Sequence, residues 1–193
     1  MLRRLYDWTL SLAARPSAPY ALAAVSFAES SFFPVPPDVM LLPMMLARPD
    51  KAWAYALICT ITSVLGGVFG YAIGALTYDT VGLALIEFYG LAGKVTEFQS
   101  WYDEYGALVI LIAGLTPLPY KLITITSGFA GYSLVWFVVL SFAARGARFY
   151  FIGLLMSRFG PFIKSVIDRH FNLVATAGIV ALVGGFVAFR YLF

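Results

Sequence analysis

Charged residues in apolar surroundings are the part of this sequence that could do chemistry. They are two acids and three bases, namely Glu29, Asp38, Lys121, Arg145 and Arg148. A lone charge inside a membrane costs about 2.5 to 3.5 kcal/mol on insertion scales, so opposite charges are expected to face one another. Arg145 and Arg148 are three residues apart and therefore share one face of a helix.

Two roles fit this set of charges, and both stay open at this point. Pairing between acids and bases would hold two parts of the chain in register, which is a structural role. Alternatively, the excess of bases leaves room for an anionic group, because arginine binds phosphate through forked hydrogen bonds. A buried acid could also take up a proton. The second role predicts proton-linked movement of an anionic headgroup.

Other kinds of chemistry find no support in the sequence. It shows no nucleophile–base pair, and its single histidine, His170, falls in an expected surface segment. We therefore expect no enzyme activity, no metal site and no cofactor. The net charge of +3 is too small and too evenly spread to indicate nucleic-acid binding.

Proline breaks interrupt the apolar runs beside these charges. The prolines are Pro34, Pro36, Pro37, Pro117 and Pro119. The apolar runs 20–33 and 105–116 that end at the two breaks are too short to cross a bilayer of about 30 Å. Each break is followed by another apolar stretch. This pattern predicts two re-entrant helical hairpins, each of which enters and leaves the membrane on one side.

The composition is that of an all-α membrane protein. Hydrophobic residues make up 61% of the chain and charged residues 12%, whereas about a quarter is usual for a soluble domain. Runs long enough to cross a bilayer are found at 52–78, 122–144 and 171–189. The acidic segment 79–104 and the basic segments around it predict that the basic segments face the cytoplasm.

One membrane domain with six parts follows from these patterns. The parts are an N-terminal amphipathic helix (1–16), a first hairpin plus transmembrane helix (17–78), an amphipathic linker (79–104), a second hairpin plus transmembrane helix (105–156), an interfacial segment (157–170) and a C-terminal transmembrane helix (171–193).

The two hairpin units repeat one another at an offset of 83 residues. PVPPD at 34–38 aligns with PLPYK at 117–121, and the same offset aligns Trp53 with Trp136. Because a hairpin returns to its own side and the next helix crosses, the second unit starts from the opposite side. An inverted repeat of this kind is a common transporter plan, with a site near the midplane where the hairpins meet. The glycines at 66–74 predict close helix packing.

These motifs resemble the DedA family of membrane proteins, which share the SNARE-associated or VTT domain, and the YqaA-like subgroup in particular. The resemblance rests on FAESSFFPVPPDVMLLP, GGVFGYAIG and GLTPLPYKLITITSGFAGYSLVWFVVLSFAARGARFYFIG, in this order, and covers about residues 17–156. It implies two facing re-entrant hairpins. It also implies flippase or scramblase activity on lipids such as undecaprenyl phosphate or phospholipids.

The resemblance also implies roles for the charged residues. Glu29 matches the family's acid before the first proline motif, Asp38 the acid that closes this motif, Lys121 the base after the second motif, and Arg145 and Arg148 the basic pair of the following helix.

The chain departs from the family pattern at two positions. Tyr71 follows Gly70 where many members have an aspartate, and Lys121 stands where many have arginine. We expect a transporter in the bacterial inner membrane that moves a lipid with an anionic headgroup, with proton coupling and oligomerisation left open. The alternatives are a proton-coupled transporter of a small solute, and a non-transporting membrane scaffold with a structural charge cluster.

Overall fold

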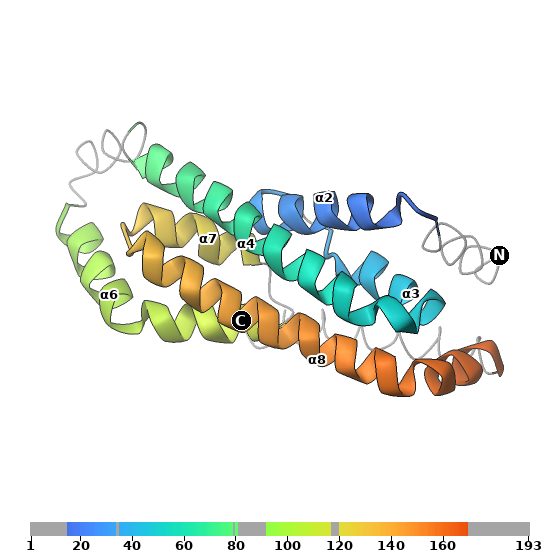
Figure 1. Cartoon of the computed structure of the whole chain (residues 1–193). Helices are drawn as coiled ribbons and strands as arrows, with labels where there is room; N and C mark the ends of the chain where they lie inside the picture. The colour runs from blue at the N-terminus through green and yellow to red at the C-terminus, as the bar shows by residue number, and fades with distance from the viewer. Residues whose placement is uncertain (1–14, 34, 79, 81–91, 117–119, 170–193) are drawn as a thin grey trace.

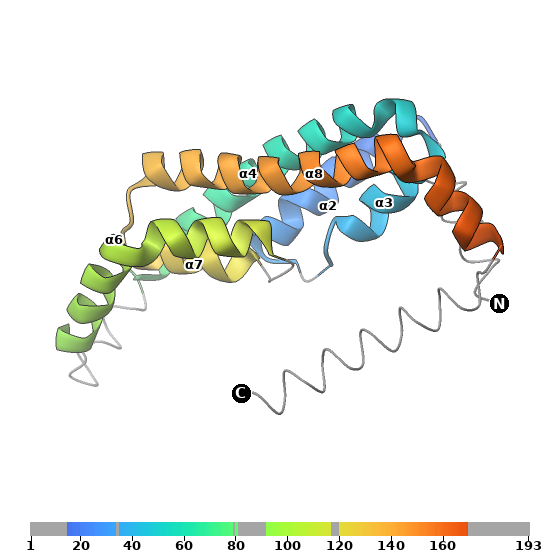
Figure 2. The same ribbon diagram turned by 90° about the horizontal axis from the view of Figure 1, so that it is seen from below.

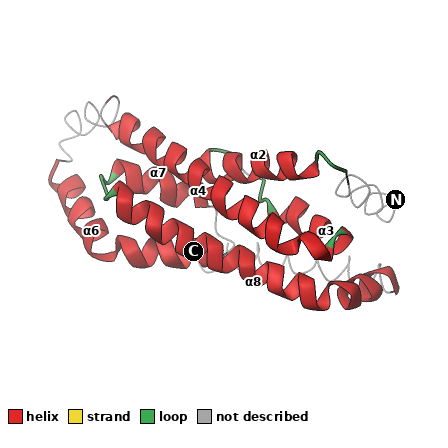
Figure 3. Cartoon of the chain, in the orientation of Figure 1, coloured by secondary structure: helices red, strands yellow, loops and turns green. Residues whose placement is uncertain are grey.

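The structure is a computed structural model. It describes residues 15–33, 35–78, 80, 92–116 and 120–169. In these ranges the chain consists of helices and connecting loops, without a strand (Figure 3). The predictions that lie outside the described residues concern most of the N-terminal helix, much of the linker, the C-terminal transmembrane helix, and the prolines Pro34, Pro117 and Pro119.

Six α-helices make up the described part of the chain, which confirms the all-α class. They are α2 (Ala18–Ser31), α3 (Asp38–Ala47), α4 (Ala52–Thr77), α6 (Ala92–Leu115), α7 (Tyr120–Phe129) and α8 (Leu134–Arg169). A single 3₁₀ turn, Pro49–Lys51, precedes α4.

The first proline break separates α2 from α3. Pro19 lies in the first turn of α2, where a missing amide hydrogen has no cost. Pro36 and Pro37 lie between the two helices. Asp38 then begins α3, and its carboxylate is favourable there because the N-terminus of a helix carries partial positive charge.

Two helices extend beyond the boundaries that the sequence suggests. The sequence places the end of the linker at residue 104, yet α6 continues without a break to Leu115. It also separates an interfacial segment at 157–170 from the preceding span, yet α8 continues to Arg169. The last part of α8 bends away from α4 (Figure 2), and Pro161 in this part removes one helical hydrogen bond.

The long helices α4 and α8 lie side by side and antiparallel in the middle of the molecule (Figures 1 and 2). Near the start of α4, the ring of Trp53 packs on Tyr150, with centroids 5.8 Å apart. Further along α4, Ser63 accepts a hydrogen bond from Arg145. Residues later in α4 therefore contact residues earlier in α8, as expected for antiparallel helices.

Helix α2 runs parallel to α4. The Ser26 hydroxyl donates to the carbonyl of Cys59, and the Ser31 hydroxyl donates to that of Gly66. Helix α2 has 14 residues and α4 has 26. At 1.5 Å per residue they are about 21 Å and about 39 Å long. Helix α4 therefore begins near the start of α2 and extends beyond its end.

Glycines let α7 approach α4 at backbone distance, in agreement with the packing role expected for residues 66–74. A Cβ atom at Gly74 would lie 1.9 Å from the carbonyl oxygen of Ile125, and one at Gly128 would lie 1.9 Å from that of Tyr71. Gly131, with φ of 73°, makes the turn from α7 to α8, a backbone conformation that favours glycine.

Two stretches, Pro49–Thr77 and Leu134–Gly160, are long and apolar enough to cross a membrane. One side of α4 carries exposed large apolar residues at every fourth position, namely Trp53, Leu57, Ile61, Leu65 and Phe69. Residues four apart lie on one face of a helix. This continuous apolar stripe is suited to contact with lipid or with another protein.

Candidate functional site

The structure brings four of the five predicted charged residues together as two ion pairs. Nη2 of Arg145 lies 3.0 Å from Oε2 of Glu29, and Nη2 of Arg148 lies 2.5 Å from Oδ2 of Asp38. The acids come from the end of α2 and the start of α3, whereas both arginines come from α8. We call the Glu29–Arg145 pair the inner pair and the Asp38–Arg148 pair the outer pair.

The inner pair belongs to a closed ring of four side chains. Nε of Arg145 donates to the Ser63 hydroxyl at 2.7 Å, and the Ser30 hydroxyl donates to Oε2 of Glu29 at 3.2 Å. The two serine oxygens are 2.7 Å apart. Because a hydroxyl has one hydrogen and that of Ser30 goes to Glu29, Ser63 is the donor to Ser30. Hydrogen bonds therefore connect Arg145 to Glu29 both directly and through the serines.

The inner pair is also tightly enclosed. The side chains of Arg145 and Glu29 are only 1% and 9% exposed. The guanidinium carbon lies 4.9 Å from the ring centre of Tyr120 and 4.7 Å from that of Phe149, which are distances for cation–π attraction. The Tyr120 hydroxyl in turn donates to Ser141 at 2.6 Å. Arg145 is thus held by its charge, its hydrogen bonds and its aromatic neighbours.

The outer pair is more open and less completely bonded. Its side chains are 14% and 21% exposed for Arg148 and Asp38. Nη1 of Arg148 donates to the carbonyl of Thr116 at 3.0 Å. In contrast, Oδ1 of Asp38 is buried and has no hydrogen-bond partner within the described part of the chain. Buried polar atoms are nearly always bonded, so this oxygen has capacity for a further donor.

The fifth predicted residue, Lys121, lies in the first turn of α7 and is partly exposed. Among the described residues it forms no ion pair with Glu29 or Asp38. Its charge is therefore available for an anion from elsewhere.

Thr124 connects α7 to α2 at the site. Its hydroxyl lies 3.0 Å from the carbonyl oxygens of both Ser30 and Lys121. The end of α2 and the start of α7 therefore touch beside the inner pair. Ser63, which marks this level on α4, is about 17 Å from the start of a helix of about 39 Å. The site thus lies near the middle of α4 and of the apolar stretch Leu134–Gly160 of α8.

The sequence does not single out the hydroxyl groups of the ring. Ser30 follows Glu29 directly, and this adjacency was the one local signal that could have drawn attention to it. Ser63 lies in a long charge-free run, where serine is also common in plain helix packing. Only the position of α8 reveals its role.

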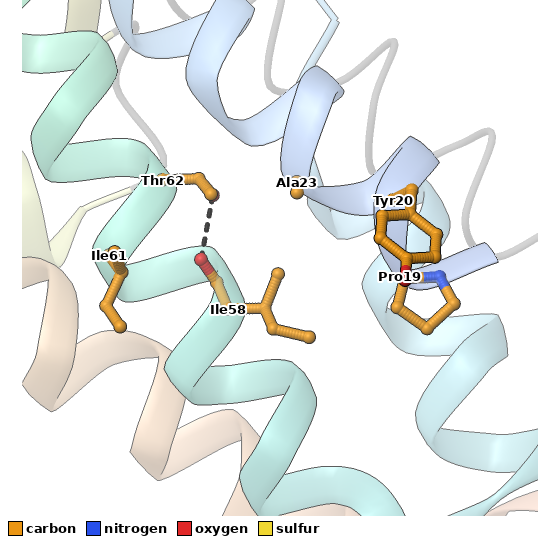
Figure 4. A pocket seen from close by; sticks show the side chains of 6 residues that line it. All are labelled: Pro19, Tyr20, Ala23, Ile58, Ile61 and Thr62. Carbon is orange, nitrogen blue, oxygen red and sulfur yellow. Dashed lines mark hydrogen bonds between the residues drawn. The ribbon is translucent and has the colours of Figure 1, made fainter. Parts of the chain in front are cut away.

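A separate cavity of about 400 Å³ lies between α2 and α4 (Figure 4). It is lined by Pro19, Tyr20, Ala23, Ile58, Ile61 and Thr62. The Thr62 hydroxyl donates to the carbonyl of Ile58 at 2.7 Å, so the hydroxyl is bonded within its own helix. The lining is apolar and includes none of the charged residues of the two pairs.

Neither ion pair is part of a metal-binding cluster. Within the ranges that the structure describes, no group of three or more His, Cys, Asp or Glu residues is placed to hold a metal ion. The acids of the site are instead matched one to one by arginines.

Two proteins described as uncharacterized are similar to this chain over most of its length. One, from Haemophilus influenzae, is 34% identical over 179 residues, which are 93% of each chain. Another, from Histophilus somni, is 36% identical over 145 residues, 75% of each chain. The chain belongs to one family with these proteins. No family model matches the chain, and no solved structure matches it.

Proposed function

We propose that the protein is an integral membrane transporter of the DedA type that moves a lipid with an anionic phosphate headgroup across the bilayer. Undecaprenyl phosphate and phospholipids are suitable substrates. One observation carries the proposal: α2 ends and α3 and α7 begin at paired and unpaired charges, near the middle of α4 and of the apolar stretch Leu134–Gly160 of α8. Charges at that depth in a membrane are expected to be functional.

The exposed surface supports a membrane location, for which we propose the bacterial inner membrane. The stripe on α4 would meet lipid, and α8 exposes further large apolar residues, namely Val135, Val139, Phe142, Phe151 and Leu154. In water such a surface would favour aggregation. Both long helices also exceed the roughly 30 Å thickness of a hydrocarbon core.

The directions of the helices support a re-entrant hairpin. Helix α2 is parallel to α4 and ends beside its middle, and the 10-residue α3 must lead back to the start of α4. A re-entrant hairpin has this geometry, because its chain enters the membrane, turns at the prolines and leaves on the side from which it entered. Residues of this turn, such as Phe32, Phe33 and Val35, are exposed among the described residues, so the proposed turn needs cover from water or from a further part of the chain.

The packing supports an inverted repeat. At the 83-residue offset, α3 coincides with α7 and α4 with the main part of α8, to within a residue at their first positions. Helix α4 packs on α7 of the other unit, and α8 packs on α3. The two long helices are antiparallel, as the inversion requires.

The charges support an anionic substrate. Lys121 forms no ion pair within the described chain, and Arg148 is partly exposed. Together they offer a point charge and a forked donor to a phosphate group. For proton coupling, which the proposal leaves open, the candidate carrier is Asp38, whose Oδ1 has no hydrogen-bond partner among the described residues.

The closed inner ring favours a second candidate, a membrane scaffold without transport activity. A fully satisfied polar network rigidifies a protein core whether or not anything moves. The open outer pair argues against a purely structural role for all of the charges. Transport measurements separate the two candidates.

The decisive test is a lipid-translocation assay in phosphatidylcholine vesicles that contain the purified protein. Labelled phosphatidylglycerol and a labelled prenyl phosphate serve as substrates, with access of a membrane-impermeant quencher as the readout. Arg148→Gln and Lys121→Gln should slow movement by about tenfold or more, the effect of losing about 1.4 kcal/mol in the transition state. Lys51→Gln, in the exposed turn before α4, is the matched control.

Three results would contradict the proposal or its parts. No movement of either lipid by folded protein would favour the scaffold. Movement of a soluble substrate alone, driven by an ion gradient, would favour a solute transporter. A pH gradient without effect on the rate would exclude proton coupling.

A further inference from the structure

Helix α7 is fastened to its neighbours by several polar contacts. Thr124 bonds to the carbonyl of Ser30, and the Ser127 hydroxyl lies 2.7 Å from that of Tyr102. The Tyr120 hydroxyl bonds to Ser141, and the backbone at Gly128 touches that of α4. Such contacts have narrow geometric requirements, so α7 cannot shift without breaking them.

Helix α3, its counterpart at the 83-residue offset, is fastened differently. In the sequence DVMLLPMMLA, Asp38 has the only side chain able to form a strong hydrogen bond, and it bonds to Arg148. The remaining contacts are apolar and involve Leu41, Met44 and Met45, which are fully buried. Methionine adapts its shape to altered surroundings more easily than other apolar residues.

The backbone of α3 is also weakened locally. Pro43 lies inside the helix and removes one of its hydrogen bonds. Pro36 and Pro37 precede the helix, and Arg48 follows it before the turn into α4. A 10-residue helix between two turns, held by one ion pair and by apolar side chains that impose no fixed bonding geometry, can move as a unit.

The two ion pairs differ in what separation would cost. Opening the inner pair would leave a buried guanidinium without its acid and would break the ring through Ser30 and Ser63. Opening the outer pair would unpair Asp38, which is already partly exposed and whose Oδ1 has no hydrogen-bond partner among the described residues. Arg148 would keep its bond to the carbonyl of Thr116. The outer pair is therefore the easier one to separate.

We propose that the outer pair is a latch and that α3 is the moving part of the site. When Asp38 leaves Arg148, α3 shifts away from α8 and Arg148 becomes free for the headgroup. Ser30 and Ser63 are positioning residues that keep the inner pair closed during this movement. This inference rests on the proposed function, because it assigns the access step of the same site.

Distances between nitroxide spin labels test the movement directly. The sole cysteine, Cys59, is buried and would be replaced by alanine. The α3–α8 distance is measured between labels at Val39 and Phe151, which are 58% and 61% exposed. The α2–α8 distance, between labels at Tyr20 and Phe151, is the internal reference. The protein is held in phosphatidylglycerol nanodiscs.

Asp38→Asn should broaden the α3–α8 distance distribution or add a longer distance, and should leave the α2–α8 distribution unchanged. Asp50→Asn, an exposed acid paired with Arg48, should change neither. Ser63→Ala should broaden the α2–α8 distribution, and Ser63→Thr, which keeps the hydroxyl, should restore it. If Asp38→Asn does not fold, the same distances are measured in Arg148→Lys. Lysine keeps the positive charge but lacks the forked guanidinium, so the pair with Asp38 should be weakened.

An unchanged α3–α8 distribution in the latch variant would overturn the proposal. Equal broadening of both distributions would also overturn it, because the whole molecule would then have loosened. These outcomes are independent of the lipid assay. If the α3–α8 distance changes but the protein moves no lipid, the transporter proposal is rejected and the latch is retained. If α3 stays rigid in a protein that moves lipid, the latch is rejected and the transporter proposal is retained.

Discussion

At the scale of single residues, two arginines one helical turn apart have different surroundings. Arg145 is buried between two aromatic rings and completes a hydrogen-bonded ring, whereas Arg148 reaches a partly exposed acid and a backbone carbonyl. The difference follows from the orientation of α8. It directs Arg145 toward Glu29 in the interior, and Arg148, three residues later, toward Asp38 at the start of α3. Equal residue types at neighbouring positions thus serve unequal purposes.

The inner pair should behave as one energetic unit. Glu29→Gln and Arg145→Met should each lower the free energy of unfolding by about 3 to 5 kcal/mol, because each leaves a buried charge without its partner. The double variant should lose clearly less than the sum. Chemical unfolding in detergent, analysed as a double-mutant cycle, measures this coupling. Additive losses would show that the two charges do not stabilise one another.

The sequence identifies the charged residues of the site but not their partners. Glu29, Asp38 and the arginines stand out because each is costly in an apolar run. Which acid meets which arginine depends on how α2 and α3 are rotated against α8, and residues more than 100 positions apart carry no local signal of this. A charge exchange that tests pairing should therefore use Asp38 and Arg148, not Asp38 and Lys121.

At the scale of helices, α3 and α7 correspond at the 83-residue offset but differ in their polar contacts. The prolines predict the break before α3 because they cannot continue a helix. Local sequence does not predict that α6 runs through residue 104, since an amphipathic segment and the apolar segment after it can share one helix when neither contains a breaker. The difference between α3 and α7 is visible only in their tertiary contacts.

Amide hydrogen exchange should report this difference. We expect the amides of Leu41, Met44 and Met45 in α3 to exchange at least about tenfold faster than those of Thr124 and Ser127 in α7, because local opening breaks fewer polar contacts in α3. Mass spectrometry of the protein in nanodiscs measures both helices in one experiment. Equal protection would contradict the assignment of α3 as the looser helix.

The contact between α4 and α7 should be sensitive to a single methyl group. Gly128→Ala would place Cβ 1.9 Å from the carbonyl oxygen of Tyr71 and should cost about 1 to 3 kcal/mol of stability. Gly93→Ala is the matched control, because nothing lies within 4 Å of its Cβ position and alanine favours a helix. Thermal unfolding of both variants decides the matter, and a tolerated Gly128→Ala would mean that the helices are not in backbone contact.

At the scale of the whole molecule, two pairs of helices approach one level from opposite ends of α4. Figure 1 shows α2 and α3 along one half of the long helices, and α6 and α7 along the other half. Composition and the 83-residue repeat predict the elements of this plan. The depth at which the two halves meet follows from the lengths of the helices and the positions of the breaks.

This plan makes a prediction about sidedness. In a Cys59→Ala background, Ser17→Cys before α2 and Lys51→Cys before α4 should react with an impermeant thiol reagent from the same side of the membrane, because the re-entrant hairpin that we propose would return to its own side. Ser133→Cys, exposed between α7 and α8, should react from the opposite side. Labelling of intact and opened vesicles distinguishes the sides. Opposite sides for Ser17 and Lys51 would show that α2 and α3 together cross the membrane.

The order in which the ribosome makes these residues has a consequence for assembly. Glu29 is 116 positions ahead of Arg145, and Asp38 is 110 positions ahead of Arg148. At about 5 to 20 residues per second, both acids wait roughly 6 to 23 seconds for their counterions. In the membrane protein that we propose, the newly made first unit would spend this time with both acids unpaired and in need of water or of shielding by the insertion machinery. The free-energy cost of the charges in α2 and α3 is then highest during synthesis, before their partners in α8 exist, and lower in the finished fold.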